Sequence, residues 1–181
     1  MYRKLPTTSY AVLGLLSLGE MSGYDIKKLA DNSIKYFFWS PASSQIYGEL
    51  RRLTSLRYAR ERKVDQEHRP DKRLYRITSS GKQALRAWIE SPQLIPDVLK
   101  STLLLKLFFG HNSSPDIVVE QLRARRRQAL ETLIQFEEIE RQLANEDRGF
   151  YPYITLKATI AHTHAELVWL EFAIEELNRS L

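Results

Sequence analysis

The sequence contains no cysteine, which excludes disulfide bonds and any zinc site built on thiolates. It also lacks a long apolar run, because the segment LLLKLFFG at 103–110 is interrupted by Lys106 and is too short to cross a bilayer. The apolar residues near the N-terminus end at Gly19 and Glu20 without a signal-peptidase pattern. These absences predict a globular protein located in the cytoplasm.

Catalytic motifs are missing as well. The sequence has no glycine-rich phosphate loop, no H-E-x-x-H pair and no nucleophile elbow. His162 and His164 are two residues apart in a predicted helix, so their side chains point about 200° apart and cannot share a metal ion. We therefore expect a protein that is not an enzyme and that holds neither cofactor nor metal. A small enzyme built around an aromatic pocket is a remaining alternative.

The charge of the chain is distributed unevenly. Residues 1–90 carry 17 Lys and Arg against 9 Asp and Glu, a net +8, whereas residues 91–181 carry 10 against 13, a net −3. A basic half attracts polyanions such as nucleic acid or an acidic membrane surface. A solvated basic surface without a partner is the alternative.

Three helices are predicted before residue 56. The first, within 6–20, has apolar residues at helical spacing and threonines that are able to cap it. The second, within 21–33, has Ser22 as its N-cap and turns Ile26, Leu29 and Ala30 inward. The third begins within the segment SPASSQIYGELRRL at 40–53, where Pro41 disfavours helix at Ser40 and suits the first helical turn.

The third helix has an unusual outer face. Its core-facing residues, Ile46, Leu50 and Leu53, fall within about 60° of one another. The opposite side is small and basic: Ser44, Gly48, Arg51 and Ser55, flanked by Gln45 and Arg52. A glycine in a helix costs roughly 1 kcal/mol relative to alanine, so we expect another surface to approach closely here.

A hairpin and a fourth helix follow. The runs LRYARERKV at 56–64 and KRLYRIT at 72–78 alternate as strands do, and the connection between them contains a proline. The segment 78–91 begins with capping residues and places Leu85, Trp88 and Ile89 on one side of a helix. Three helices, a hairpin and a helix predict a winged helix-turn-helix domain over residues 1–92.

Residues 93–181 are predicted to form a helical dimerisation domain, so the fold class is mainly α. The segment PQLIP at 92–96 marks the boundary, and an apolar helix is expected around Val98–Phe109. A helix of some thirty residues starts at Pro115, with Ser114 as its N-cap. After a turn at 148–153, the last helix has a coiled-coil-like heptad pattern, and its stripe is predicted to pair with a second copy. The residues of this predicted dimer seam are Leu156, Ile160, Leu167, Leu170, Ile174 and Leu177. A core within one chain is the alternative for the same stripe.

The small and basic face of the third helix predicts duplex DNA as the partner. A helix that enters the major groove needs short side chains and donors that reach base edges and phosphates. The residues that meet this need are Ser43, Ser44, Gln45, Gly48, Arg51 and Arg52. In the hairpin, Arg69, Lys72 and Arg73 occupy the position of a wing that touches the backbone or minor groove.

The segments YAVLGLLS, SGYDIKK, SSQIYGELRRL and RPDKRLYRITSSGKQALRAWI resemble the PadR family of bacterial transcriptional regulators. The helical remainder is similar to the C-terminal dimerisation domain of its virulence-activator-like branch. The resemblance implies a dimeric regulator, most often a repressor that a small aromatic or amphipathic molecule releases from its operator. It adds Tyr47 to the residues that read DNA. Two recognition helices one helical turn apart would read a palindromic operator. The sequence departs from the family at Arg57, where a glycine commonly ends the third helix.

An effector pocket is a further hypothesis, because ligand pockets often lie at domain junctions. The aromatic residues considered for it are Trp39, Trp88, Phe108, Tyr151 and Trp169. Core packing accounts for most of them equally well. An alternative to DNA binding is a winged-helix interaction module whose basic face meets an acidic protein.

Overall fold

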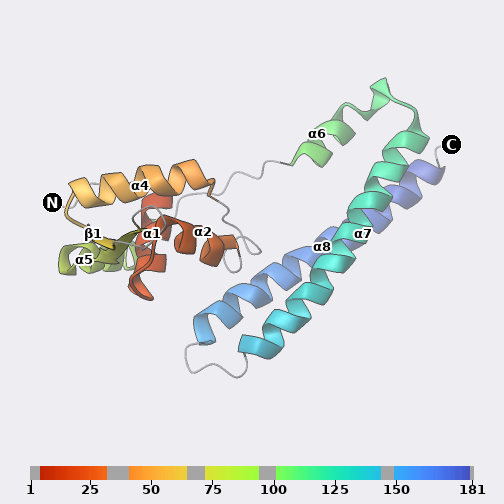
Figure 1. Ribbon diagram of the computed structural model, residues 1–181. Helices are drawn as coiled ribbons and strands as arrows, with labels where there is room; N and C mark the ends of the chain where they lie inside the picture. The colour runs from red at the N-terminus through yellow and green to blue at the C-terminus, as the bar shows by residue number, and fades with distance from the viewer. Residues whose placement is uncertain (1–4, 32–40, 65–71, 94–100, 144–148, 180–181) are drawn as a thin grey trace. The chain divides into compact units, whose positions relative to one another are not determined.

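The computed structural model describes residues 5–31, 41–64, 72–93, 101–143 and 149–179. The chain divides into two compact units, Met1–Ile95 and Pro96–Leu181, here called the front unit and the rear unit. The front unit contains α1 (Thr7–Ser17), α2 (Gly23–Asp31), α4 (Ser43–Ser55), β1 (Ala59–Val64), β2 (Lys72–Ile77) and α5 (Ser79–Ile89) (Figure 1). The rear unit contains α6 (Thr102–Phe108), the 3₁₀ helix η1 (Gly110–Asn112), α7 (Pro115–Leu143) and α8 (Phe150–Arg179). This order confirms the predicted fold class, a winged helix-turn-helix followed by a helical domain.

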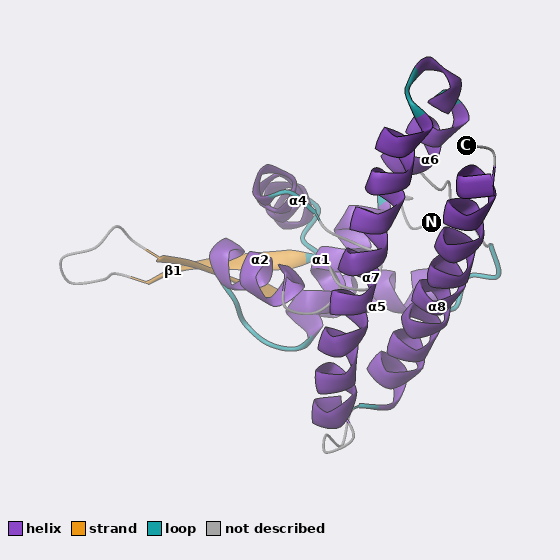
Figure 2. Ribbon diagram, turned by 90° about the vertical axis from the view of Figure 1, so that its right-hand side faces the viewer, coloured by secondary structure: helices purple, strands orange, loops and turns teal. Residues whose placement is uncertain are grey.

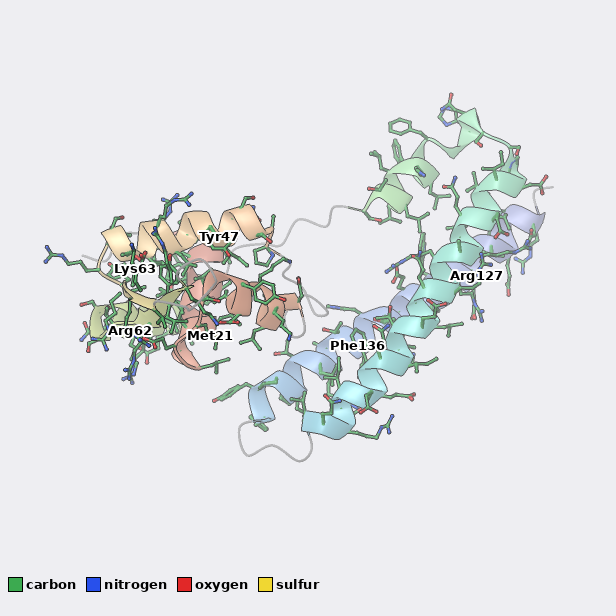
Figure 3. The ribbon with its side chains drawn as sticks, viewed as in Figure 1. Met21, Tyr47, Arg62, Lys63, Arg127 and Phe136 are labelled. Carbon is green, nitrogen blue, oxygen red and sulfur yellow. The ribbon has the colours of Figure 1, made fainter. Side chains whose placement is uncertain are left out.

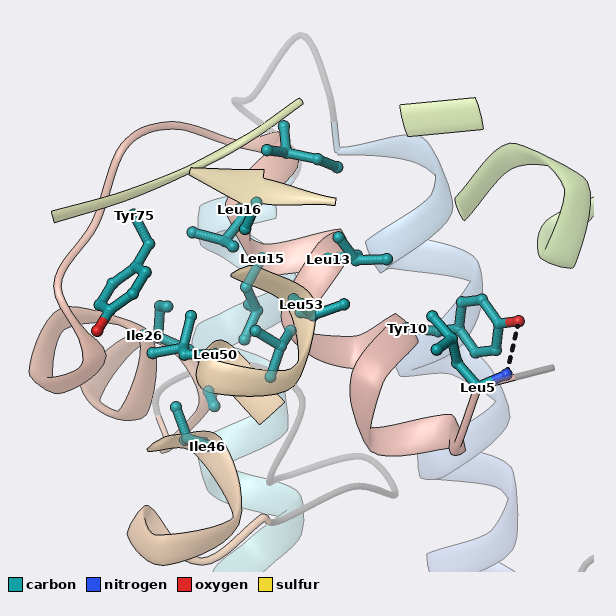
Figure 4. Close-up of a cluster of buried hydrophobic side chains, with 14 residues drawn as sticks. Leu5, Tyr10, Leu13, Leu15, Leu16, Ile26, Ile46, Leu50, Leu53 and Tyr75 are labelled. Carbon is teal, nitrogen blue, oxygen red and sulfur yellow. Dashed lines mark hydrogen bonds between the residues drawn. The ribbon is translucent and has the colours of Figure 1, made fainter. Parts of the chain in front are cut away.

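The front unit has one continuous core between α1, α2, α4 and the hairpin (Figure 4). Most residues predicted to face inward are buried, whereas Ala11 and Leu29 are half-buried. The buried ones are Val12, Leu15, Leu16, Ile26, Ala30, Ile46, Leu50 and Leu53. The predicted cap of α2 is also confirmed, because the Ser22 hydroxyl accepts the Asp25 N–H at 3.2 Å. The N-cap of α1 is Pro6 rather than a threonine, and no side chain caps that helix.

The turn after α4 explains how Arg57 replaces the expected glycine. The Tyr58 N–H bonds to the Leu53 carbonyl at 2.9 Å, and the Arg57 N–H bonds to the Thr54 carbonyl at 3.0 Å. These two bonds form a Schellman motif, which needs a left-handed residue after the C-cap. Arg57 adopts this conformation with φ of 59°. The chain therefore makes the turn that glycine usually makes, with a residue less suited to it.

The hairpin pairs β1 with β2 in antiparallel register, from Ala59 opposite Ile77 to Val64 opposite Lys72, and extends beyond the helices as a wing (Figure 2). Its base is anchored by burial of Ala59, Tyr75 and Ile77. Met21 adds a third, one-residue pairing, since it exchanges two backbone hydrogen bonds with Tyr75, at 3.0 and 2.8 Å. The sequence carried no strand pattern at Met21, so this pairing was not predicted.

The α5 helix starts as predicted, with the Thr78 hydroxyl accepting the Gly81 N–H at 3.1 Å. Its predicted inward face needs correction, because Gly81 and Ala84 are the buried residues, and Leu85 packs only partly against the core. Trp88 stacks on Tyr10 at 4.7 Å between ring centroids but is 40% exposed, and Ile89 is 67% exposed. A side chain at Gly81 would overlap the Tyr58 carbonyl, so the small residue there lets α5 lie against the chain after α4.

In the rear unit, α7 and α8 form a long antiparallel pair. The Arg125 guanidinium binds the Glu166 carboxylate through two bonds, of 2.8 and 2.7 Å. Further ion pairs join Arg126 to Glu171 and Glu140 to Lys157. Glu140 near the end of α7 pairs with Lys157 near the start of α8, as antiparallel packing requires.

The heptad stripe of α8 faces α7 of the same chain. Leu156 and Leu170 are fully buried and Leu167 is 9% exposed within a single copy. Ile174 and Leu177 pack against the cluster of Leu122 and Leu170, and Ile160 is half-buried. A core within one chain, the alternative reading of the stripe, is therefore present at Leu156, Leu167 and Leu170, and pairing of the stripe with a second copy stays a prediction.

Other apolar side chains of the rear unit remain exposed. They are Leu104, Leu105, Phe108, Phe109, Ile117, Leu130, Ile134, Phe150, Tyr151, Ile154, Val168 and Phe172. The predicted turn at 148–153 is shorter than expected, because α8 already begins at Phe150 and accommodates Pro152 in its first turn. Among the described helices, none has the length and apolar character to cross a membrane.

Candidate nucleic-acid interface

The α4 helix presents its predicted outer face to solvent. Its inner face is fixed by Ile46, Leu50 and Leu53, none of which has exposed surface. On the outer side, the predicted contact residues are exposed, with Gly48 half-exposed among them: Ser43, Ser44, Gln45, Arg51 and Arg52. The structure thus brings these residues together on one surface of a firmly anchored helix.

The two arginines of this face differ in their partners. The Arg52 Nε lies 3.2 Å from a carboxylate oxygen of Glu49, which is only 9% exposed and also accepts the Ser9 hydroxyl from α1. Arg52 is therefore oriented by a buried carboxylate. Arg51 has no carboxylate within ion-pair distance in the described part of the chain. Its charge is available to an external anion.

Gln45 and Tyr47, both predicted to contact DNA, also make contacts within the front unit. The Gln45 side-chain oxygen accepts the Ala42 N–H at 2.9 Å at the start of α4. This bond leaves the amide nitrogen of Gln45 with both hydrogens to donate. The Tyr47 ring, 44% exposed, packs on Gly23 at the start of α2, where any side chain would collide with it. Tyr47 consequently fixes the separation of α2 and α4 while keeping part of its ring in solvent.

At the wing, Lys72 and Arg73 lie next to carboxylates of the front unit. The Lys72 Nζ is 3.0 Å from Asp25, and an Arg73 nitrogen is 3.2 Å from Glu61. Hydrogen bonds from Ser22, followed by the effect of Lys72, lower the pKa of Asp25 below its ordinary value. Lys72 thereby ties the wing to the start of α2. The predicted contact Arg69 lies outside the described residues.

A second basic group on the hairpin was not predicted as a site. Arg60 lies opposite Arg76, and Arg62, on the other side of β1 from Lys63, binds Glu20 (Figure 3). The hydrogen bond from Arg62, with the charges of Arg76 and Arg60, lowers the pKa of Glu20. The alternation of arginines in β1 was the signal for this group, since residues two apart share a face of a strand.

The aromatic residues of the predicted effector pocket are distributed over both units, and a pocket at their junction stays a prediction. Trp88 belongs to the front unit and stacks on Tyr10, whereas Phe108 is 78% exposed and Tyr151 is 80% exposed in the rear unit. Tyr151 and Trp169 are separated by about 27 Å along α8 at 1.5 Å per residue. Trp39 lies outside the described residues.

A hollow of about 410 Å³ lies instead between α6, η1 and α7. Leu103, Leu107, Phe109 and Val118 supply apolar walls, and Lys106 supplies a cation. Clusters of three or more His, Asp or Glu side chains able to hold a metal ion do not occur among the described residues.

Comparison with known proteins identifies the family. Residues 12–87 match the transcriptional regulator PadR-like family, and residues 99–178 match the virulence activator alpha C-terminal family. The chain is 30% identical to the negative transcriptional regulator PadR of Bacillus subtilis, over 94% of this chain and 97% of that protein. The chain belongs to the PadR family of transcriptional regulators. It is a DNA-binding regulator of the winged-helix type.

Solved PadR-family structures share the fold over nearly the whole chain. The crystal structure of Bacillus subtilis PadR in complex with operator DNA has a TM-score of 0.82 and 29% identity, covering 95% of this chain and 99% of that one. The same protein in complex with p-coumaric acid has a TM-score of 0.73 and 28% identity, covering 97% and 99%. The Vibrio cholerae virulence activator AphA has a TM-score of 0.70 and 25% identity, covering 96% and 99%. These similarities bear out the predicted recognition of the family and its function in transcription.

Proposed function

We propose that this protein is a repressor that acts in the cytoplasm and binds a palindromic operator as a dimer, with α4 of each copy in the major groove. Among its relatives, the Bacillus subtilis PadR is a negative regulator whose structure with operator DNA has been determined. Two copies related by a twofold axis would present two α4 helices to half-sites about 34 Å apart, one turn of DNA.

The observation that carries the proposal is the contrast between the two sides of α4. The inner side is completely buried, so the helix is held rigidly, and the outer side offers short polar residues with the unpaired cation of Arg51. Such a surface fits a groove about 12 Å wide whose walls are phosphates. Ser43, Ser44 and Gln45 precede Arg51 on the helix and would lie nearest the base edges, because recognition helices contact bases through their N-terminal residues.

Dimer formation is supported by the exposed apolar side chains of the rear unit. On α8, Val168 and Phe172 are one turn apart, 68% and 61% exposed, and on α7 Leu130 and Ile134 have the same spacing. Monomeric proteins seldom leave so much apolar surface in water. A second copy would cover these residues, which join the partly exposed residues of the α8 heptad stripe in the proposed seam.

The test uses the full-length protein and duplexes selected by it from a random pool, followed by anisotropy titrations at several salt concentrations. We expect log Kd to depend on log salt with a slope of several units, because each neutralised phosphate contributes about 0.9. Arg51→Ala should weaken binding about tenfold and reduce the slope by about 1. Arg86→Ala, which removes the same charge from α5, is the matched control and should change neither quantity.

Two outcomes would contradict DNA reading by α4. One is binding that is insensitive to salt, and the other is an equal effect of Arg51→Ala and Arg86→Ala. If the protein binds an acidic protein instead of DNA, and Arg51→Ala abolishes that binding, the alternative of a winged-helix protein-interaction module is supported.

A small aromatic acid is the second element of the proposal, because the Bacillus subtilis PadR structure includes p-coumaric acid. In this chain the hollow between α6, η1 and α7 has apolar walls and the cation of Lys106, which suits an aromatic ring with a carboxylate. Titration of the DNA complex with phenolic acids should release the duplex. Lys106→Met should weaken this response without changing DNA affinity, and release that is unaffected by Lys106→Met would exclude the hollow as the site.

A further inference from the structure

Gly48 occupies the middle of the exposed face of α4. Its surface neighbours one turn away are Ser44, Arg51 and Arg52, which belong to the proposed reading face. Glycine is among the least favourable residues inside a helix, because it has the most backbone freedom to lose. A glycine at this position therefore calls for a specific reason.

Packing among the residues that the structure describes does not supply that reason. A Cβ placed on Gly48 would meet no atom of the described residues within 4 Å. The contrast is with Gly23 and Gly81, where an added Cβ would overlap the Tyr47 ring and the Tyr58 carbonyl. Those two glycines are required by neighbours inside the front unit, whereas the space above Gly48 opens to solvent.

We propose that the space above Gly48 is occupied by DNA, and that this residue sets how deeply α4 enters the major groove. With no side chain at position 48, a base edge or sugar can pack directly against the helix backbone. The shorter distance lets Ser44 reach base edges that it would otherwise miss. Gly48 thus determines specificity because it has no side chain that would hold the helix away from the bases. This inference rests on the proposed binding of DNA by α4.

The test compares Gly48→Ala with the wild type for stability, for affinity to the selected operator and for affinity to unrelated duplex DNA. Alanine should raise the melting temperature by about 2–4 °C, the shift expected when one helical glycine is replaced in a chain of this size. It should weaken operator binding at least fivefold. Binding to unrelated DNA, which depends on phosphate contacts, should change less than twofold. Gly48→Gln should weaken operator binding further.

Gly14 provides a matched control. It lies in the middle of α1, and a Cβ there would also meet nothing within 4 Å. Gly14→Ala should raise the melting temperature to a similar extent and leave operator affinity unchanged. The opposite signs of the two effects at Gly48, greater stability with weaker binding, would separate a DNA contact from a structural role.

Two outcomes would overturn the inference. One is full operator affinity in both Gly48→Ala and Gly48→Gln, and the other is an equal loss in Gly14→Ala. In either case the Arg51→Ala titration still reports on α4 itself. If Arg51→Ala retains its tenfold effect, only the role of Gly48 is rejected. If wild-type protein binds no duplex in a salt-dependent manner, the proposed function is rejected together with it.

Discussion

The two units bury their apolar residues to very different extents. Among the described residues, fifteen buried apolar residues belong to the front unit and eight to the rear unit. Of the large apolar side chains that remain exposed, five are in the front unit and twelve in the rear unit. The front unit closes its own core, whereas the rear unit is a pair of long helices with apolar surface left over. The front unit therefore presents a rigid surface, and the rear unit leaves apolar side chains that the proposed second copy would cover.

The charges follow the same division. The basic excess lies within residues 1–90, where the α4 helix and the wing present exposed arginines, and the acidic excess lies within residues 91–181. In the rear unit, arginines of α7 bind glutamates of α8 and so hold the helix pair together. The same residue type therefore stabilises the rear unit and remains available for an external anion at Arg51 in the front unit.

The largest expected effect comes from opening the closed core. Leu50 of α4 has no exposed surface and contacts the α1 and α2 side of the core, so Leu50→Ala should lower the free energy of unfolding by about 2–5 kcal/mol. Urea titration followed by circular dichroism measures the loss. Tyr24→Ala, at a 69% exposed position of α2, is the control and should cost less than about 1 kcal/mol. Equal losses at the two positions would contradict a core centred on α4.

A charge on the uncovered surface of the rear unit should separate the copies. Phe172→Asp places a carboxylate at a 61% exposed position of α8, where the free chain tolerates it but an apolar interface does not. We expect dimer dissociation to become at least 30-fold more favourable, about 2 kcal/mol, with helical content unchanged. Light scattering across a concentration series measures the change.

Tyr24→Asp in the front unit is the matched control for Phe172→Asp and should leave the dimer intact. An undisturbed dimer in Phe172→Asp would show that α8 does not provide the seam. A monomer that still binds operator as tightly as the wild type would argue against the twofold reading of the operator.

The order of elements in the front unit and the inner face of α4 could be predicted, because helical spacing places apolar residues on the face that a single core buries. Ile46, Leu50 and Leu53 illustrate this, since all three are buried as expected. The outer face of α4 is exposed, as predicted. The inner face of α5 could not be predicted, since Gly81 and Ala84 rather than Trp88 and Ile89 are buried there.

The pairing of Met21 with Tyr75 could not be predicted, because one residue is too short to show an alternating pattern. The ion pairs of Lys72 with Asp25 and of Arg73 with Glu61 could not be predicted, because they join residues that are distant in the sequence.

The rear unit shows where spacing alone is ambiguous. A heptad stripe indicates that a helix packs against another helix, but the pattern is the same whether the partner is in the same chain or a second copy. Leu156 and Leu170 turned out to face α7 of their own chain. The effector residues stay a prediction, although Tyr151 and Trp169 lie about 27 Å apart along one helix.

The smallest expected effect concerns the turn that joins α4 to the wing. Arg57 has φ of 59°, a left-handed conformation that costs roughly 1 kcal/mol for a residue with a side chain and little for glycine. Arg57→Gly should therefore stabilise the front unit by up to about 1 kcal/mol in urea titration, while Phe172 and the rear unit are untouched. If the exposed arginine also neutralises a phosphate, the same variant should reduce the salt slope of operator binding by about 1.

Arg57→Asn separates the two contributions, because asparagine tolerates the left-handed region but lacks the charge. It should reduce the salt slope as much as Arg57→Gly does, with a smaller gain in stability. A destabilised Arg57→Gly would mean that the arginine makes contacts in the fold that outweigh its backbone conformation.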